Sequence, residues 1–109
     1  MNIKNLLAAL VLLVVATPAF AAVSLSQPAN NALYLAPAAA IPVRANASAS
    51  GGLTVDRVEF YANGNLIHTD TTSPYQFDWT NVAAGTYVIT AKMVDSASGE
   101  TTSAPRTIN

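Results

Sequence analysis

Apolar and polar residues alternate along much of the chain, and this alternation predicts β-strands. The pattern is clearest over residues 41–48, 57–62 and 87–94, where every second side chain is apolar. A period of two places one face of a strand in a core and leaves the other face in solvent. Beyond residue 22, no long stretch repeats apolar positions three and four apart, so we expect strands throughout.

Shorter extended segments complete the pattern, and turn residues separate them. Asn63-Gly64 directly follows one alternating run and precedes the next, which is the strongest short sequence signal for a β-hairpin. Pro105 marks the last segment as an edge or bulged strand. About seven strands with turns every 8 to 12 residues predict an all-β, immunoglobulin-like sandwich of antiparallel strands. The remaining expected strands cover residues 23–26, 32–35, 66–71, 75–79 and 101–108.

The N-terminal residues differ from the rest and predict a cleavable signal peptide. Lys4 precedes an unbroken apolar run at residues 6–16, and residues 19–21 supply the small-x-small pattern that signal peptidases recognise. The run is shorter than the ~20 residues that span a bilayer, so we expect no transmembrane anchor. A buried N-terminal helix is the alternative. We predict a signal peptide at residues 1–21 and one secreted Ig-like domain, extracellular or periplasmic, at residues 22–109.

Charge and cysteine content narrow the possible partners. Beyond the predicted signal peptide the chain has four basic and six acidic side chains, and no basic cluster. Binding to a nucleic acid backbone therefore has no electrostatic support. The chain has no cysteine, so its stability has to come from a packed core, and we expect the fold to be indifferent to redox conditions.

Several ordered motifs carry a resemblance to a known family. Val58 to Gly64 has the sequence VEFYANG, and residues 70–87 follow with DTTSPYQFDWTNVAAGTY. With VSLSQPAN at residues 23–30 and the segment at 95–105, they closely resemble the bacterial Ig-like domains appended to secreted glycoside hydrolases, chitinases and surface proteins. The resemblance implies an Ig-like fold and a non-catalytic role.

The same segments predict the structural core. Tyr87 stands two residues before Ile89, after the corner at residues 81–85, as in the tyrosine corner of Ig domains. We expect its hydroxyl to bond back to the corner backbone. Phe60, Phe77 and Trp79 have core parity and are expected to form the aromatic centre of the core.

No constellation of residues supports catalysis or metal binding, so we expect no enzyme activity, cofactor or metal. His68 is the only histidine, and the chain offers no cysteine beside it, so we expect it exposed on a strand. Asp56 and Glu59 have opposite parity, whereas Arg57 and Glu59 share a face and are expected to form a surface ion pair. The acidic segment at residues 95–100 lacks the alternating ligands of a calcium loop and is expected to be a turn.

The sequence offers two kinds of candidate binding surface. The edges at residues 23–35 and 101–108 could pair with a strand of a partner protein. Tyr61 and Tyr34 could instead stack on a sugar, since both are expected at outward or edge positions. The first reading predicts a structural or adhesion module that contacts an unidentified protein or surface partner. The alternative is a carbohydrate-binding accessory protein associated with polysaccharide degradation.

Overall fold

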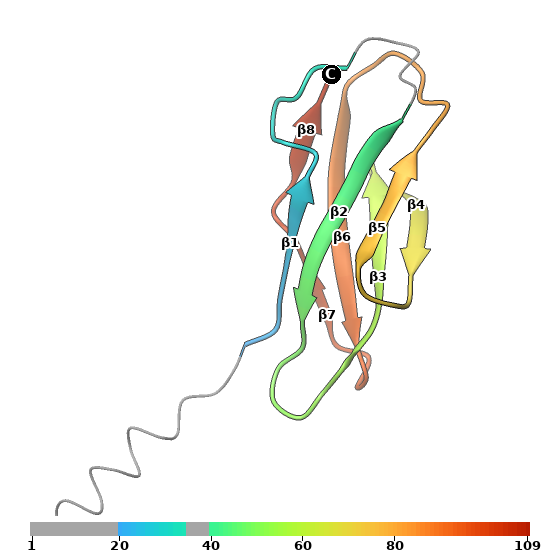
Figure 1. Cartoon of the computed structure of the whole chain (residues 1–109). Helices are drawn as coiled ribbons and strands as arrows, with labels where there is room; N and C mark the ends of the chain where they lie inside the picture. Colours follow the sequence, from blue (N-terminus) through green and yellow to red (C-terminus); the bar gives the residue numbers. More distant parts are fainter. Residues whose placement is uncertain (1–19, 35–39) are drawn as a thin grey trace, which may run out of the picture.

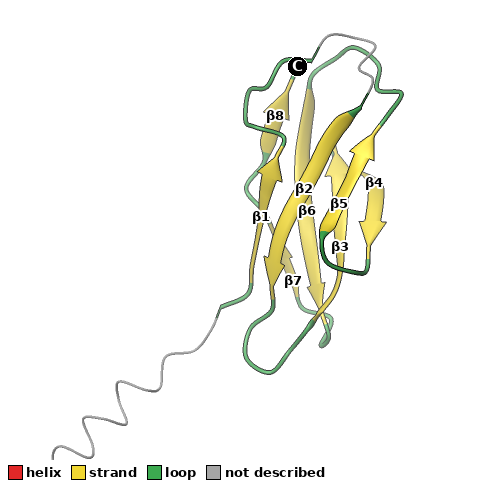
Figure 2. Ribbon diagram, in the orientation of Figure 1, coloured by secondary structure: helices red, strands yellow, loops and turns green. Residues whose placement is uncertain are grey.

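Two antiparallel sheets pack face to face, as the alternation predicts (Figure 1). The computed structural model describes residues 20–34 and 40–109, and every regular element in these residues is a strand (Figure 2). The smaller sheet has the order β1-β2-β5. The larger sheet has the order β4-β3-β6-β7, with β8 also paired to β6. The strands are β1 (Ala22–Gln27), β2 (Ile41–Ser48), β3 (Val55–Ala62), β4 (Asn65–Asp70), β5 (Tyr75–Trp79), β6 (Tyr87–Asp95), β7 (Glu100–Thr102) and β8 (Arg106–Ile108).

The hairpin between β3 and β4 forms at the predicted position. Asn63 and Gly64 adopt positive φ values of 50° and 81°, and Ala62 pairs with Asn65 on either side of them. Two consecutive residues with positive φ give a turn whose twist matches that of the flanking strands. This confirms the role predicted for the Asn-Gly pair.

The core lies between the sheets and is built from the inward positions of each strand. Phe60 from the larger sheet and Val43 from the smaller sheet are both fully buried, and they represent the two layers. Side chains from two inner faces interdigitate in this way in β-sandwiches. The other buried members of this cluster are Leu25, Ile41, Ala45, Val58, Ala62, Val82, Ile89, Ala91, Met93 and Ile108.

The last predicted strand is interrupted, so residues 100–108 hold two of the eight strands that the described residues contain, β7 and β8. Residues 103–105 separate β7 from β8, in keeping with the edge or bulge expected at Pro105. Residues 32–35 were expected to form a short strand. Ala32 makes only an isolated parallel bridge to Ile108, and residue 35 lies outside the described residues.

The predicted signal peptide at residues 1–21 lies outside the described residues except for Phe20 and Ala21. Phe20 is exposed, and Ala21 packs against the edge of the core. Over residues 20–34 and 40–109, no helix has the length and apolar character needed to cross a membrane. The cleavage of residues 1–21 remains a prediction.

Candidate functional site

The outer face of the larger sheet carries a network of charged and hydroxyl side chains. Arg57, Glu59 and Tyr61 project from this face because they alternate on β3 with the buried Val58 and Phe60. The register between β3 and β6 adds a basic side chain to them, since Lys92 lies opposite Glu59. One strand and its neighbour therefore gather four polar side chains on one surface.

The Glu59 carboxylate is the centre of this network. Its Oε2 accepts a hydrogen bond of 3.0 Å from Arg57 Nε, and its Oε1 accepts one of 2.7 Å from the Tyr61 hydroxyl. Lys92 Nζ lies 3.3 Å from the same Oε1 and 3.4 Å from a carboxylate oxygen of Glu100. The predicted ion pair between Arg57 and Glu59 is thus present, within a larger set of contacts.

These contacts shift the acidity of the groups that make them. The hydrogen bonds from Tyr61 and then Arg57 lower the pKa of Glu59 from 4.5 to about 2. The same carboxylate raises the pKa of the Tyr61 hydroxyl, and hydrogen bonding to Tyr61 and Glu59 raises the pKa of Lys92. All three groups favour the protonation state in which the network is complete.

Tyr61 was predicted as a ligand contact, but its hydroxyl and its ring already contact other side chains of the domain. Its hydroxyl bonds to Glu59, and Lys92 Nζ lies over its ring, 5.4 Å from the ring centroid. Leu66 lies opposite Tyr61 on β4, and Val88 lies diagonally from it on the same face. Leu66 is 55% exposed and Val88 is 41% exposed. Tyr61, Leu66 and Val88 form the apolar part of this face, here called the sheet-face patch.

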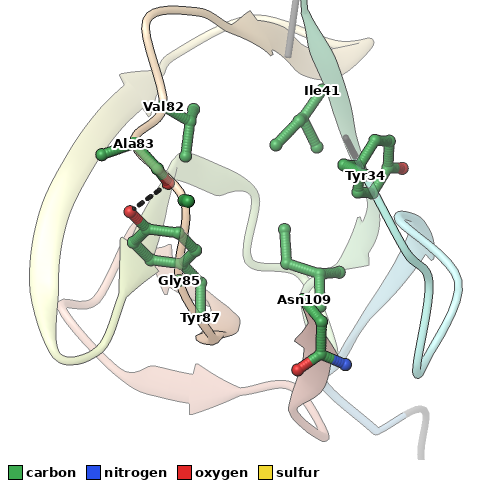
Figure 3. A pocket seen from close by; sticks show the side chains of 9 residues that line it. Tyr34, Ile41, Val82, Ala83, Gly85, Tyr87 and Asn109 are labelled. Carbon is green, nitrogen blue, oxygen red and sulfur yellow. Dashed lines mark hydrogen bonds between the residues drawn. The ribbon is translucent and has the colours of Figure 1, made fainter. Parts of the chain in front are cut away.

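Tyr34 lies apart from Tyr61, at the end of the sandwich where β8 finishes. It is half-buried and lines a small hollow of about 20 Å³ that is open to solvent (Figure 3). Tyr87 and Asn109 stand on the other sides of this hollow. The structure therefore does not bring the two predicted contact residues together. The other side chains and backbone that line the hollow belong to Ile41, Val82, Ala83, Ala84, Gly85 and Ile108.

Tyr87 closes the corner that precedes β6. Its hydroxyl donates a hydrogen bond of 2.8 Å to the Ala83 carbonyl oxygen (Figure 3), and Gly85 has a φ of 156° beside its ring. A tyrosine that bonds back to the backbone a few residues upstream is a hallmark of Ig-type sandwiches. The hydrogen bond predicted for Tyr87 is confirmed.

Sequence comparison agrees with this geometry. A family model described as the bacterial Ig domain matches residues 22–91 of the chain. The chain belongs to the bacterial Ig domain family. The match includes β1 to β5 and the first part of β6, so it contains strands of both sheets of the Ig domain.

A solved structure shows the same fold. It is a structure of the fibronectin(III)-like modules of CbhA from Clostridium thermocellum, and it is 29% identical to this Ig domain with a TM-score of 0.73. The alignment covers 80% of this chain and 92% of that chain. No curated protein sequence matches the chain significantly.

The predicted aromatic centre of the Ig domain is divided between two places. Phe60 and Phe77 pack together with their ring centroids 5.2 Å apart. Trp79 instead meets Tyr87 edge to face at 5.1 Å. Phe60 and Ile89 are fully buried, whereas Phe77, Trp79 and Tyr87 are half-buried against the core. Phe77 and Trp79 are less buried because β5 is the outer strand of its sheet.

His68 was expected to be exposed, and that expectation is wrong. Its imidazole is half-buried and stacks on Phe77, with ring centroids 4.3 Å apart and planes 14° apart. The register between β3 and β4 shifts between Phe60 and Tyr61. The extra residue turns His68 toward the core side, although Leu66 two positions earlier faces solvent.

Parts of the two predicted docking edges are hydrogen-bonded to each other. The Asn31 N–H donates to the Thr107 carbonyl at 2.7 Å, and the Tyr34 N–H donates to the Asn109 carbonyl at 2.9 Å. The Asn109 N–H in turn donates to the Ala32 carbonyl at 3.0 Å. These backbone groups are already paired within the Ig domain.

Arg106 covers a further part of the N-terminal edge. Its Nη2 donates a hydrogen bond of 3.0 Å to the Leu25 carbonyl of β1, so the side chain bridges the two sheets. A charged side chain placed along an edge strand is one way in which natural sheets discourage strand pairing. The faces of the Ig domain are therefore better candidates for contacts than these edges.

The acidic residues that were weighed for chemistry take part in structural contacts. Asp56 pairs with Arg57 at 2.8 Å on the surface. The Asp95 carboxylate accepts hydrogen bonds from the backbone N–H groups of Ala97 and Gly99, at 2.9 and 2.8 Å. The segment at residues 95–100 is thus the expected turn. Among the described residues, no three His, Cys, Asp or Glu side chains are grouped as they would be around a metal ion.

Sequence patterns did not predict the structural roles of two polar side chains. Ser103 is buried, and its Oγ accepts a hydrogen bond of 3.0 Å from the Ala91 N–H where β7 has ended. Asp70 accepts hydrogen bonds from the N–H groups of Thr72 and Gln76, at 3.2 and 3.1 Å, and so holds the turn between β4 and β5. Aspartate and serine are common in turns, but nothing local identifies the partners 12 residues away in the case of Ser103.

Proposed function

We propose that this Ig domain is a non-catalytic exported module that contacts a protein partner or a cell surface, in a structural or adhesive role. The sheet-face patch is the observation that carries the proposal. Exposed aliphatic side chains of Leu66 and Val88 flank Tyr61 on one face of the larger sheet, and the ion pairs of Glu59 border it. An exposed apolar patch with a polar rim is typical of an interaction site.

Membership of the bacterial Ig family supports the non-catalytic part of the proposal. The similar CbhA modules are described as fibronectin(III)-like, which is also the description of a module and not of an enzyme. Export rests on the predicted signal peptide. Mass spectrometry of secreted material is expected to find a chain that begins at Ala22, and an intact segment at residues 1–21 would contradict export by cleavage.

Surface variants test the contact role. Leu66→Lys and Val88→Lys introduce charges into the sheet-face patch, while Leu53→Lys changes an exposed leucine outside it. Binding of the labelled Ig domain to envelope preparations of the producing cells should fall with the two patch variants and persist with Leu53→Lys. Equal binding by all three variants would contradict a contact through this face.

The side chains at the rim of the small hollow beside Tyr34 support carbohydrate binding as a second candidate function, in which a sugar would lie against the rim and not inside the hollow. Two tyrosine rings and an Asn109 amide border it, and aromatic rings with polar side chains are suited to sugar recognition. Retention on insoluble chitin or cellulose should be lost with Tyr34→Ala if the rim of the hollow binds sugar. Loss with Tyr61→Ala alone would instead indicate the sheet-face patch, and no retention of the unmodified domain would contradict this second candidate for these two polymers.

A further inference from the structure

Asn63 makes more contacts than its place in a two-residue turn requires. Its backbone N–H donates to the Val88 carbonyl at 2.9 Å. Its side-chain Oδ1 accepts a hydrogen bond of 2.9 Å from the Val88 N–H, and its Nδ2 donates one of 3.3 Å to the Thr86 carbonyl. Both ends of the side-chain amide are thus bonded to the start of β6.

These bonds join the β3–β4 hairpin to the C-terminal end of the sandwich. Thr86, whose carbonyl accepts from Asn63, donates its own hydroxyl to Asn109 Oδ1 at 2.9 Å. Thr86 also precedes Tyr87, which closes the corner. The contacts of Asn63, here called the Asn63 clamp, therefore hold the hairpin tip against β6.

Asn63 is also followed by Gly64, and this pair is chemically reactive. Because glycine has no side chain to obstruct the approach, the Gly64 backbone nitrogen can attack Asn63 Cγ once it has lost its proton to solvent. A bond forms between that nitrogen and Cγ, the side-chain nitrogen takes up a proton from solvent, its bond to Cγ breaks, and ammonia leaves. Water then opens the resulting cyclic imide at either carbonyl and gives aspartate or isoaspartate.

We propose that Asn63 is a site of spontaneous deamidation that the native fold suppresses through the Asn63 clamp. For the Gly64 nitrogen to reach Cγ, the side-chain amide has to turn away from the positions that its bonds to Val88 and Thr86 fix. Asparagine is among the thermolabile residues of proteins. The extent of modification at Asn63 should therefore increase with the time that a molecule has spent with the tip of this hairpin detached from β6.

The products also keep the hairpin from returning fully. An aspartate at position 63 can still accept from the Val88 N–H, but it has no donor for the Thr86 carbonyl, and its charge faces that oxygen. An isoaspartate adds a carbon to the main chain between the two positive-φ residues of the turn. Either product weakens the Asn63 clamp, so a modified domain opens at this end more readily.

The rate of deamidation in the folded and unfolded chain tests the proposal. The domain is incubated in mildly alkaline buffer with and without denaturing urea. Peptide mapping by mass spectrometry then detects the increase in peptide mass that accompanies replacement of NH2 by OH. Breaking two hydrogen bonds should slow the reaction by about tenfold to a hundredfold in the folded domain. Asn46, which precedes Ala47 within β2, is the internal control and should change little in either state.

Two results would overturn the proposal. One is equal deamidation of Asn63 with and without urea, because the clamp then gives no protection. The other is an Asn63→Asp variant whose urea midpoint and hairpin amide exchange match those of the unmodified domain, because the clamp then does not depend on the amide. We expect this variant to unfold at lower urea and to exchange its β4 amides faster.

Discussion

The hydroxyl of Tyr87 and the carbonyl oxygen of Ala83 are joined by a hydrogen bond of 2.8 Å across the corner that leads into β6. Through this bond, the Tyr87 side chain holds the four residues before it in place. It also connects the half-buried ring, which packs on Trp79, to the surface of the corner. The corner and the core beneath it are therefore stabilised by the same residue.

Removing only that hydroxyl should have a small and measurable cost. Tyr87→Phe keeps the ring in place and is expected to lower the free energy of unfolding by about 0.5–1.5 kcal/mol, the usual net contribution of one hydrogen bond. Urea unfolding measures it. Tyr75→Phe is the control, because Tyr75 is also half-buried and its hydroxyl makes no hydrogen bond to the described residues; the idea fails if the two variants lose equal stability.

Ser103→Ala is expected to be more damaging than its size suggests. The change leaves the Ala91 N–H without its acceptor inside the sandwich, where Ala91 is fully buried. An unpaired buried donor costs about 1–3 kcal/mol. Ser24→Ala, on the exposed outer face of β1, should change stability by less than about 0.5 kcal/mol under the same conditions, and similar losses for both serines would argue against the Ser103 bond.

Phe60→Ala should destabilise the domain more than Trp79→Ala. Phe60 is fully buried between the sheets, whereas Trp79 is only half-buried on the outer strand of the smaller sheet. Truncating a fully buried large aromatic residue costs about 3–5 kcal/mol, and a partly exposed ring should cost less. Thermal and urea unfolding of both variants checks the order, and the reverse order would place Trp79 at the true centre of the core.

The charged network on the larger sheet should make part of the stability depend on acid pH. Glu59 has a pKa of about 2 in the fold and an ordinary value of 4.5. As the pH falls, the unfolded chain takes up its proton first, so the contribution of Glu59 is complete above the ordinary value and is lost between about pH 5 and pH 2. Unfolding of Glu59→Gln over this range should lack that component.

Tyr61→Phe provides a second test of the same network. It removes the hydrogen bond that lowers the pKa of Glu59 most, so the acid loss of stability should begin at the same pH as in the unmodified domain but be smaller and end at a higher pH. An identical acid limb in Tyr61→Phe would show that the hydroxyl does not act on Glu59.

The sequence predicted those features that depend on neighbouring residues. Asn63-Gly64 specifies a turn by itself, and Tyr87 was recognised by its place after a corner, so both were confirmed. Parity within a strand also identified Phe60 and Ile89 as core residues. His68 was expected to be exposed because it lacks catalytic or metal-binding partners, and alternation could not correct this, since it does not reveal the extra residue in β4 that turns His68 inward.

Contacts between distant segments were beyond the reach of sequence patterns. Arg106 bonds to Leu25 across 81 positions of the chain, and no local signal marks either residue. The burial of Trp79 depends on whether β5 has a neighbour on its outer side, which only the order of strands in the sheet decides. The hollow beside Tyr34 likewise forms from segments far apart in the sequence.

The pairing of residues 31–34 with the end of β8 has a mechanical consequence. β1 begins at one end of the sandwich and β8 finishes at the other, and the two strands run in the same direction (Figure 1). Tension applied at Ala22 and Asn109 would therefore load the bonds from Asn31, Tyr34 and Asn109 along the strand axis. Bonds loaded in shear have to break together and not one after another, so the domain should yield to stretching only at high force.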